Sequence, residues 1–256
     1  MSETALHHEL SRLNFLADDD FEMLDELLSR RHTLAAGDLM VMDGDPMEQT
    51  TVVLDGWAFR FKDFPDGRRQ IFNFLLPGDI VGMFALMFGN ARCGVEALTA
   101  LEVAAFPSAR LVPVFQNCPR LALALSWLAG QDERLLHEQI TRVGSRAATE
   151  RMAHLFIELY LRLLRVGVDE EAARRLPLTQ VMLAETLGMS HVHANRCFRE
   201  LVRAGAAEAR NSHVWLLDPD FLAKRGGFDA GYLEQQEVPQ RTRNVAADHD
   251  VGSNCT

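Results

Sequence analysis

The sequence predicts an α+β fold: an N-terminal antiparallel β-roll, then a long helix, then a small C-terminal domain of helices closed by a hairpin. Three features predict it. Short apolar segments alternate with Gly and Asp turns over residues 31–106, which is typical of antiparallel strands. Apolar residues then recur at helical spacing over residues 119–143, which indicates one long helix. Amphipathic helical segments follow from residue 149 and lead into two short strand-like segments.

Length and composition indicate a globular protein with two modest domains. The chain has 256 residues, of which 48% are hydrophobic and 24% charged, as in ordinary globular proteins. No stretch approaches the length of a transmembrane span, and the N-terminus does not resemble a signal peptide. We therefore expect a cytoplasmic protein without a membrane partner. The cysteines, at positions 93, 118, 197 and 255, are too dispersed to hold an iron–sulfur cluster.

The N-terminal half begins with an amphipathic stretch, residues 13–30, that predicts one or two short helices. The roll follows. Its Asp-Gly pairs at positions 55–56 and 66–67 are residues that tight hairpin turns prefer. Segments such as TTVVL, RQIFNFLL and LEVAAF alternate with these turns. This alternation favours an antiparallel roll or barrel over a parallel α/β sheet.

The long helix predicted over residues 119–143 has two interpretations. Its apolar stripe could pack on the helix's own domain, or it could form a two-stranded coiled coil with a second copy of the chain. The length of the stripe, its charged flanks and its place after the roll favour the coiled coil. The members of the stripe are Leu121, Leu125, Leu128, Leu135, Ile140 and Val143.

Two capped helices separated by a glycine turn lie within residues 178–204. In LTQVMLAETLG, Thr179 is a suitable N-cap and Gly188 ends the helix. In SHVHANRCFREL, Ser190 caps a second helix that we expect over residues 191–204. Helix, short glycine turn and second helix form the helix-turn-helix pattern. The second helix of such a pair can enter the major groove of double-stranded DNA.

Charge supports a nucleic-acid partner at this place. The whole chain has a net charge of −10, but residues 140–226 contain thirteen Lys and Arg against ten Asp and Glu. Local charge governs attraction to phosphate. A two-fold symmetric homodimer on a palindromic operator would also account for the coiled coil. The expected DNA-contacting residues are Thr179, Gln180, Ser190, His191, His193, Asn195, Arg196 and Arg199.

A metal site is the alternative for the same stretch, because His191, His193 and Cys197 lie within seven positions and all three residue types bind transition metals. On a helix, however, residues two apart point to opposite sides, which separates the two histidines. Cys197 is expected to pack inward beside Phe198 and Leu201. No metal site is therefore predicted.

The remaining C-terminal segments complete a winged domain. Residues 149–165 predict a core helix, and GVDEEAARR predicts a polar loop. AEARNSHVWLLD predicts two strands around Asn211 and Ser212, the position of a wing. DPDFLAKR predicts a last helical turn. Residues 227–256 lack a core pattern, and a disordered tail is expected there.

This order of elements resembles the Crp–Fnr family of bacterial transcription regulators. The segment LPGDIVGMFALMFGNARCGVEALTALEVAAFP is similar to that family's effector-pocket segment, and LTQVMLAETLGMSHVHANRCFREL to its DNA-reading unit. The resemblance implies a cyclic-nucleotide-binding-like sensor domain over 1–118, a dimerisation helix over 119–145 and a winged helix-turn-helix over 146–226. It also implies RNA polymerase as a partner, beside DNA and a second copy of the chain.

The effector-pocket segment departs from the family's cyclic AMP pattern. Relatives that bind cyclic AMP have Gly-Glu and, some ten residues on, Arg-Ser. Here Gly82 and Arg92 match, but Met83 and Cys93 stand where glutamate and serine are expected. Methionine cannot accept the ribose hydroxyl proton. Cyclic AMP is therefore not expected, no cofactor is predicted, and the effector is left unidentified.

Two other functions compete with DNA binding. The chain could be a cyclic-nucleotide-type module that regulates a partner protein, but the predicted helix-turn-helix and wing disfavour this. It could also be a cupin-like enzyme. The roll segment, residues 31–106, contains His32 as its single histidine, whereas cupin metal sites need several. No Ser-His-Asp or paired-carboxylate arrangement is evident, so no enzymatic activity is predicted.

Overall fold

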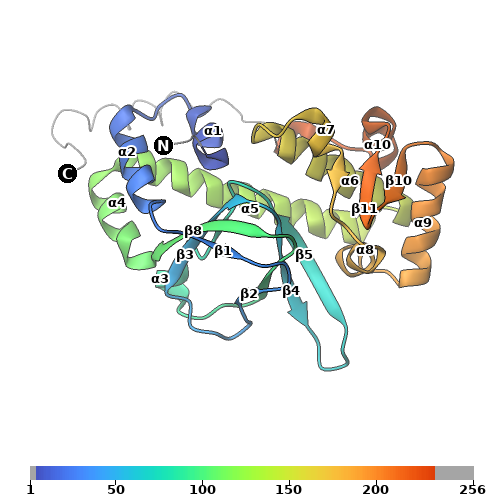
Figure 1. Ribbon diagram of the computed structural model, residues 1–256, viewed down its shortest axis with the longest axis horizontal. Helices are drawn as coiled ribbons and strands as arrows, with labels where there is room; N and C mark the ends of the chain where they lie inside the picture. Colours follow the sequence, from blue (N-terminus) through green and yellow to red (C-terminus); the bar gives the residue numbers. More distant parts are fainter. Residues whose placement is uncertain (1–3, 234–256) are drawn as a thin grey trace. The chain divides into compact units, whose positions relative to one another are not determined.

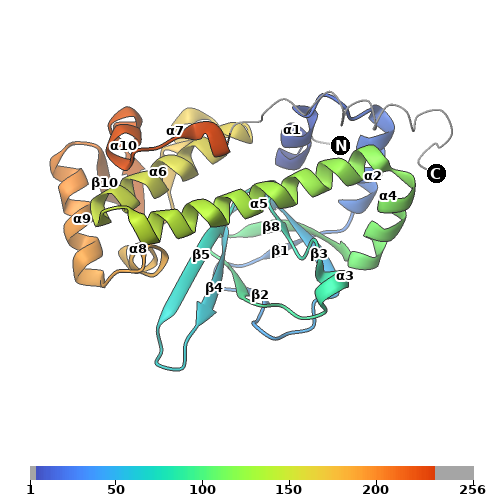
Figure 2. The same cartoon turned by 180° about the vertical axis from the view of Figure 1, so that it is seen from behind.

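The computed structural model describes residues 4–233, which divide into two compact units. Unit 1 contains the residues up to Ala58 and Leu75–Glu133. Unit 2 contains Phe59–Phe74 and Arg134–Tyr232. The long helix α5, Pro119–Ser145, contributes its first part to unit 1 and its last part to unit 2. Figure 2 shows it as one unbroken helix.

Antiparallel strands make up the roll, as predicted (Figure 1). One sheet has the order β1-β8-β3-β6 and the other the order β2-β7-β4-β5. In the first sheet, Val53 of β3 lies opposite Val103 of β8. The Asp-Gly turn at 55–56 has Gly56 at φ +86°, a region that glycine adopts without strain. The strands are β1 Arg31–Leu34, β2 Leu39–Val41, β3 Gln49–Asp55, β4 Ala58–Asp63, β5 Arg69–Leu75, β6 Ile80–Val81, β7 Gly94–Ala97 and β8 Leu101–Pro107.

Helices cover the roll in unit 1. They are α1 Ala5–Ser11, α2 Asp18–Leu27, α3 Ala85–Phe88, the 3₁₀ turn η1 Ser108–Arg110 and α4 Leu111–Asn117. Helix α2 lies within the amphipathic stretch of residues 13–30. Helix α1 was not predicted, because its seven residues hold too few apolar positions to show a helical period.

The apolar stripe of α5 is used partly within its own unit. Leu121 and Leu125 are buried in a cluster with Leu6, Leu10 and Phe106, and Leu128 packs against the same cluster. Leu121 and Leu125 are therefore not available to a second chain, which corrects the coiled-coil interpretation for these two members of the stripe, whereas Leu128 is half-buried. Ile140, in contrast, is 70% exposed.

Unit 2 contains the predicted winged helix-turn-helix. Its elements are α6 Ala148–Arg165, α7 Glu170–Ala173, β9 Arg175–Leu176, α8 Gln180–Leu187, α9 His191–Arg203, β10 Ala207–Arg210, β11 His213–Leu216, α10 Pro219–Gly226 and the 3₁₀ turn η2 Ala230–Tyr232. The strands form one sheet in the order β10-β11-β9. Asn211 and Ser212, at φ 49° and 60°, form the predicted tight turn of the wing.

Two expectations for unit 2 need correction. The segment expected to be a polar loop contains α7 and β9, because the Asp169 side chain caps α7 by accepting from the Ala172 amide at 3.0 Å. The expected disordered tail begins with ordered residues, since the Tyr232 hydroxyl donates to Glu158 at 2.6 Å. Residues 234–256 of that tail lie outside the described residues. Among helices within 4–233, none is long and apolar enough to cross a membrane.

Candidate nucleic-acid interface

The helix-turn-helix is fixed by local hydrogen bonds that its sequence predicts. The Thr179 hydroxyl accepts from the Met182 amide at 3.2 Å and begins α8. Gly188 ends α8 at φ 62° and ψ 42°, a left-handed conformation that favours glycine. The Ser190 hydroxyl then accepts from the His193 amide at 3.3 Å and begins α9. Helix α9, His191–Arg203, is thus the helix expected over residues 191–204.

One face of α9 is buried and fixes how the helix rotates about its axis. Ala194, Cys197, Phe198 and Leu201 are buried, at the spacing of one helical face. Phe198 meets Phe156 of α6 edge to face, with ring centroids 6.3 Å apart. Cys197 is a buried free thiol, which confirms the prediction that it packs inward.

The opposite face of α9 is basic and exposed. Arg196 and Arg199 are both exposed, and Arg203 follows one turn later on the same side. Within residues 4–233, these three guanidinium groups have no hydrogen bond or ion pair. Arg203 was not among the predicted residues, although its spacing of seven from Arg196 is a signal that could have found it.

The other predicted residues lie at the start of the two helices. Thr179, Gln180, Ser190 and His191 are exposed, while His193 and Asn195 are half-buried. The Asn195 side-chain amide donates to the side-chain carbonyl oxygen of Gln180. Two of the predicted DNA-contacting residues are therefore hydrogen-bonded to each other. The pair connects the first turn of α8 to α9.

The single acidic residue of α9, Glu200, is directed away from the arginines. Its carboxylate accepts from the Thr149 hydroxyl of α6 at 2.6 Å. This bond leaves the arginine face without an internal counter-charge from α9 itself. An unpaired cationic face next to a helix N-terminus attracts anions, and phosphate in particular.

The wing is the hairpin of β10 and β11 (Figure 1), and it combines aromatic and basic side chains. Arg175 and Arg210 each lie 5.8 Å from the ring centroid of Trp215, within the range of cation–π attraction. Arg210 also pairs with Glu208 on its own strand. Its charge is therefore partly neutralised, in contrast to the arginines of α9.

The effector-pocket candidates lie on one segment of unit 1. Gly82 has φ +78°, and a Cβ atom there would lie 2.6 Å from the Gln49 carbonyl oxygen, so this position requires glycine. Met83 packs against the apolar cluster of helices α1, α2, α4 and α5. Arg92 is exposed, and within residues 4–233 it forms no hydrogen bond or ion pair. Cys93 is half-buried.

Comparison with known proteins identifies both halves of the chain. Residues 31–118 match the model of the cyclic nucleotide-binding domain, and residues 150–225 that of the Crp-like helix-turn-helix domain. The transcriptional activatory protein AadR of Rhodopseudomonas palustris is 30% identical over 169 residues, which cover 65% of this chain and 69% of AadR. The chain belongs to the Crp–Fnr family of transcription regulators.

Further members of the Crp–Fnr family match over a longer stretch. The nitrogen fixation regulation protein FixK of Bradyrhizobium diazoefficiens is 29% identical over 76% of this chain and 81% of its own length. The solved structure of FixK2 from Bradyrhizobium japonicum shares the fold with a TM-score of 0.66 and 22% identity, covering 78% of this chain and 98% of that chain. This Crp–Fnr protein is therefore a DNA-binding transcription regulator.

Proposed function

We propose that the protein acts as a homodimer on a palindromic operator, with α9 of each copy in a major groove. The face of α9 carries this proposal, because Arg196, Arg199 and Arg203 are exposed and leave their guanidinium groups available to DNA. Arginine contacts guanine through two hydrogen bonds or binds a phosphate. Two copies would present two such faces to half-sites about one helical turn apart.

The exposed face of α5 supports the dimer. Six of its exposed residues follow one another at intervals of four, three, four, three and four positions, which is the spacing of a coiled-coil seam, and Thr141 and Ser145 are exposed next to the last two of them. Ile140, 70% exposed, would supply apolar contact, and the small residues of the stripe would permit close approach. This seam stripe consists of Ser126, Gly130, Glu133, His137, Ile140 and Gly144.

We further propose that the regulator activates transcription through contact with RNA polymerase. Support comes from relatives, since AadR and the Anr protein of Pseudomonas aeruginosa are both named transcriptional activators. In this proposal the chain itself catalyses no reaction and functions by binding.

An effector other than cyclic AMP is proposed for the roll. Met83 offers no carboxylate to a ribose hydroxyl, since its side chain is a thioether, and the residue packs against an apolar cluster. Arg92 is exposed and could pair with an anion. Loss of effector-dependent DNA binding in Arg92→Ala would support an anionic effector.

Selection of duplexes from a random pool by the purified protein tests the DNA-binding proposal. We expect enrichment of an inverted repeat with a fixed distance between its halves. Binding of the enriched duplex should weaken steeply with salt, because phosphate contacts release counterions. Enrichment of a single asymmetric site, or none, would contradict the proposal.

A further inference from the structure

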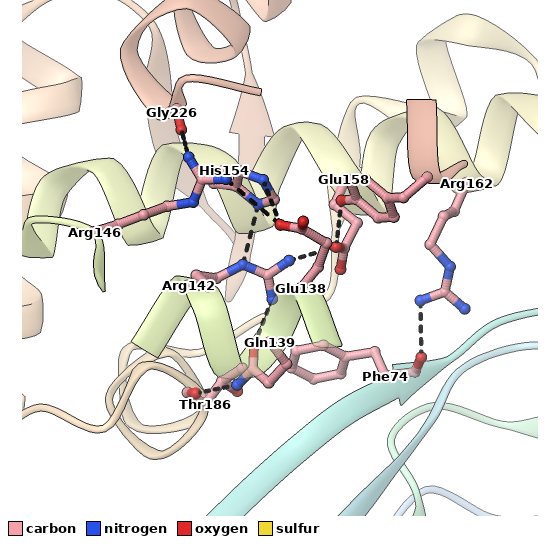
Figure 3. A network of polar contacts seen from close by, with 11 residues as sticks. Phe74, Glu138, Gln139, Arg142, Arg146, His154, Glu158, Arg162, Thr186 and Gly226 are labelled. Carbon is pink, nitrogen blue, oxygen red and sulfur yellow. Dashed lines mark hydrogen bonds and ion pairs between the residues drawn. The ribbon is translucent and has the colours of Figure 1, made fainter. Parts of the chain in front are cut away.

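A buried polar network joins the last part of α5 to α6 and α8 within unit 2 (Figure 3). Its centre is Arg142, whose side chain is 2% exposed. The guanidinium donates to the Glu158 carboxylate and to the Gln139 carbonyl oxygen, and its Nε donates to His154 Nδ1 at 3.2 Å. Arginine is almost never buried this deeply without such partners.

Gln139 extends the network to the helix-turn-helix. While its carbonyl oxygen accepts from Arg142, its amide Nε2 donates to the Thr186 carbonyl oxygen of α8 at 2.7 Å. Arg142 has only donors, so it determines which end of the Gln139 amide faces it. The opposite end, with its N–H groups, must then face α8. Gln70 of β5 also donates to the Thr186 carbonyl, at the longer distance of 3.3 Å.

The position of α8 is transmitted to α9 by direct contacts. Gln180 of α8 accepts from Asn195 of α9, and only Gly188, Met189 and Ser190 separate the two helices. Helix α6, which supplies Glu158 to Arg142, also holds α9 through the Phe156–Phe198 ring contact. A shift of α5 against α6 and α8 would therefore change where the arginine face of α9 lies relative to α5.

We propose that Arg142 and Gln139 are positioning residues that fix the recognition helix α9 relative to α5 and thereby set the distance between the two DNA half-sites. The inference rests on the proposed homodimer, in which α5 lies at the two-fold axis. Hydrogen bonds are directional and specify one arrangement, whereas apolar helix faces tolerate sliding. Neither residue contacts DNA in this account.

The test uses full-length protein with three kinds of duplex: the selected palindrome, the same palindrome with one base pair added or removed between its halves, and a single half-site. The main variant is Gln139→Glu. Its carboxylate still accepts from Arg142 but has no N–H for the Thr186 carbonyl. Arg142→Lys is the second variant, since one ammonium can pair with Glu158 but does not reproduce the planar guanidinium fork. Arg225→Gln, which removes an ion pair with Glu150 outside the network, is the control.

In both variants we expect affinity for the palindrome to fall about tenfold, which is within the usual range for coupling between sites. Preference for the selected spacing should decrease, while half-site affinity and the dimeric state stay as in the wild type. Arg225→Gln should bind all duplexes as the wild type does. Unchanged spacing preference in the variants, or an equal loss on half-site and palindrome, would overturn the inference. If the wild type itself ignored spacing, the homodimer proposal would fail instead.

Discussion

His154 lies in the same buried network and should make the stability of unit 2 depend on pH. It is 0% exposed. Its Nδ1 accepts from Arg142 Nε at 3.2 Å, which requires an unprotonated Nδ1. The proton of the neutral ring then resides on Nε2, 3.5 Å from the Glu138 carboxylate. Burial, and next the charges of Arg142 and Arg146, lower the pKa of His154 from 6.5 to about 3.

The sign and size of the effect follow from this pKa. Below pH 6.5 the unfolded chain binds a proton at residue 154, whereas the folded protein does not until the pH approaches 3. Stability is therefore lost as the pH falls from 6.5 towards 3. Between pH 7.5 and pH 5.5 the loss should be about 1.4 kcal/mol, because pH 5.5 lies one unit below the pKa of the unfolded state.

Urea denaturation at the two pH values measures this loss. In the parent protein for this experiment, Trp57 and Trp127 are replaced by Phe. Trp215 of unit 2 is then the single tryptophan, so its fluorescence reports the unfolding of unit 2. His154→Gln, which cannot titrate, should lose about 1.4 kcal/mol less than its parent between these pH values. His213→Gln, on the wing and outside the network, serves as the control and should lose as much as the parent. Equal losses for the parent and His154→Gln would refute this account of the buried imidazole.

Three further predictions concern the DNA-binding function. Arg196→Ala should weaken operator binding by about 1–3 kcal/mol and relax preference at one base pair in each half-site. A uniform loss across sequences, with a salt slope lower by about one, would instead indicate a phosphate contact. Ile140→Glu should give monomers in sedimentation, because it places a carboxylate in the seam stripe of each copy, while Val112→Glu, an exposed apolar position on α4, should remain dimeric. Calorimetry should detect no binding of cyclic AMP at micromolar concentration, and tight binding would show that the ribose does not need a carboxylate at position 83.

The helix-turn-helix was predictable because its signals are local. Thr179 and Ser190 cap helices whose first turns follow directly, and Gly188 adopts the left-handed conformation that the turn requires. The wing turn at Asn211 and Ser212 is equally local. In each case the residue that determines the structure lies within three positions of the backbone group it satisfies.

The use of α5 could not be predicted from periodicity, because a helix can have more than one apolar partner. Leu121 and Ile140 both fit a helical stripe, yet the first is buried in unit 1 and the second is 70% exposed. Periodicity gives the spacing of a face and not the identity of what covers it. The network around Arg142 could not be predicted for a related reason, since its contacts join residues up to 116 positions apart in the sequence.

The chemistry of the Arg142 network indicates whether it contributes to stability or to the geometry of DNA binding. Replacing a buried ion pair with apolar side chains of similar size is often neutral or stabilising, so the Arg142–Glu158 pair is weak evidence for stability alone. Its donors are instead distributed over three acceptors on two helices, and the Gln139 amide uses both of its ends. An apolar contact of equal area would tolerate several rotations of α5 about its axis. The hydrogen bonds of Arg142 and Gln139, in contrast, can all form only at one rotation of α5. A double variant with Met at positions 142 and 158 should therefore lose spacing preference on the palindrome, and its loss of stability in urea should be limited to the cost of leaving Tyr232, Gln139 and His154 without these partners. Loss of stability with spacing preference intact would assign the network to folding and not to DNA geometry.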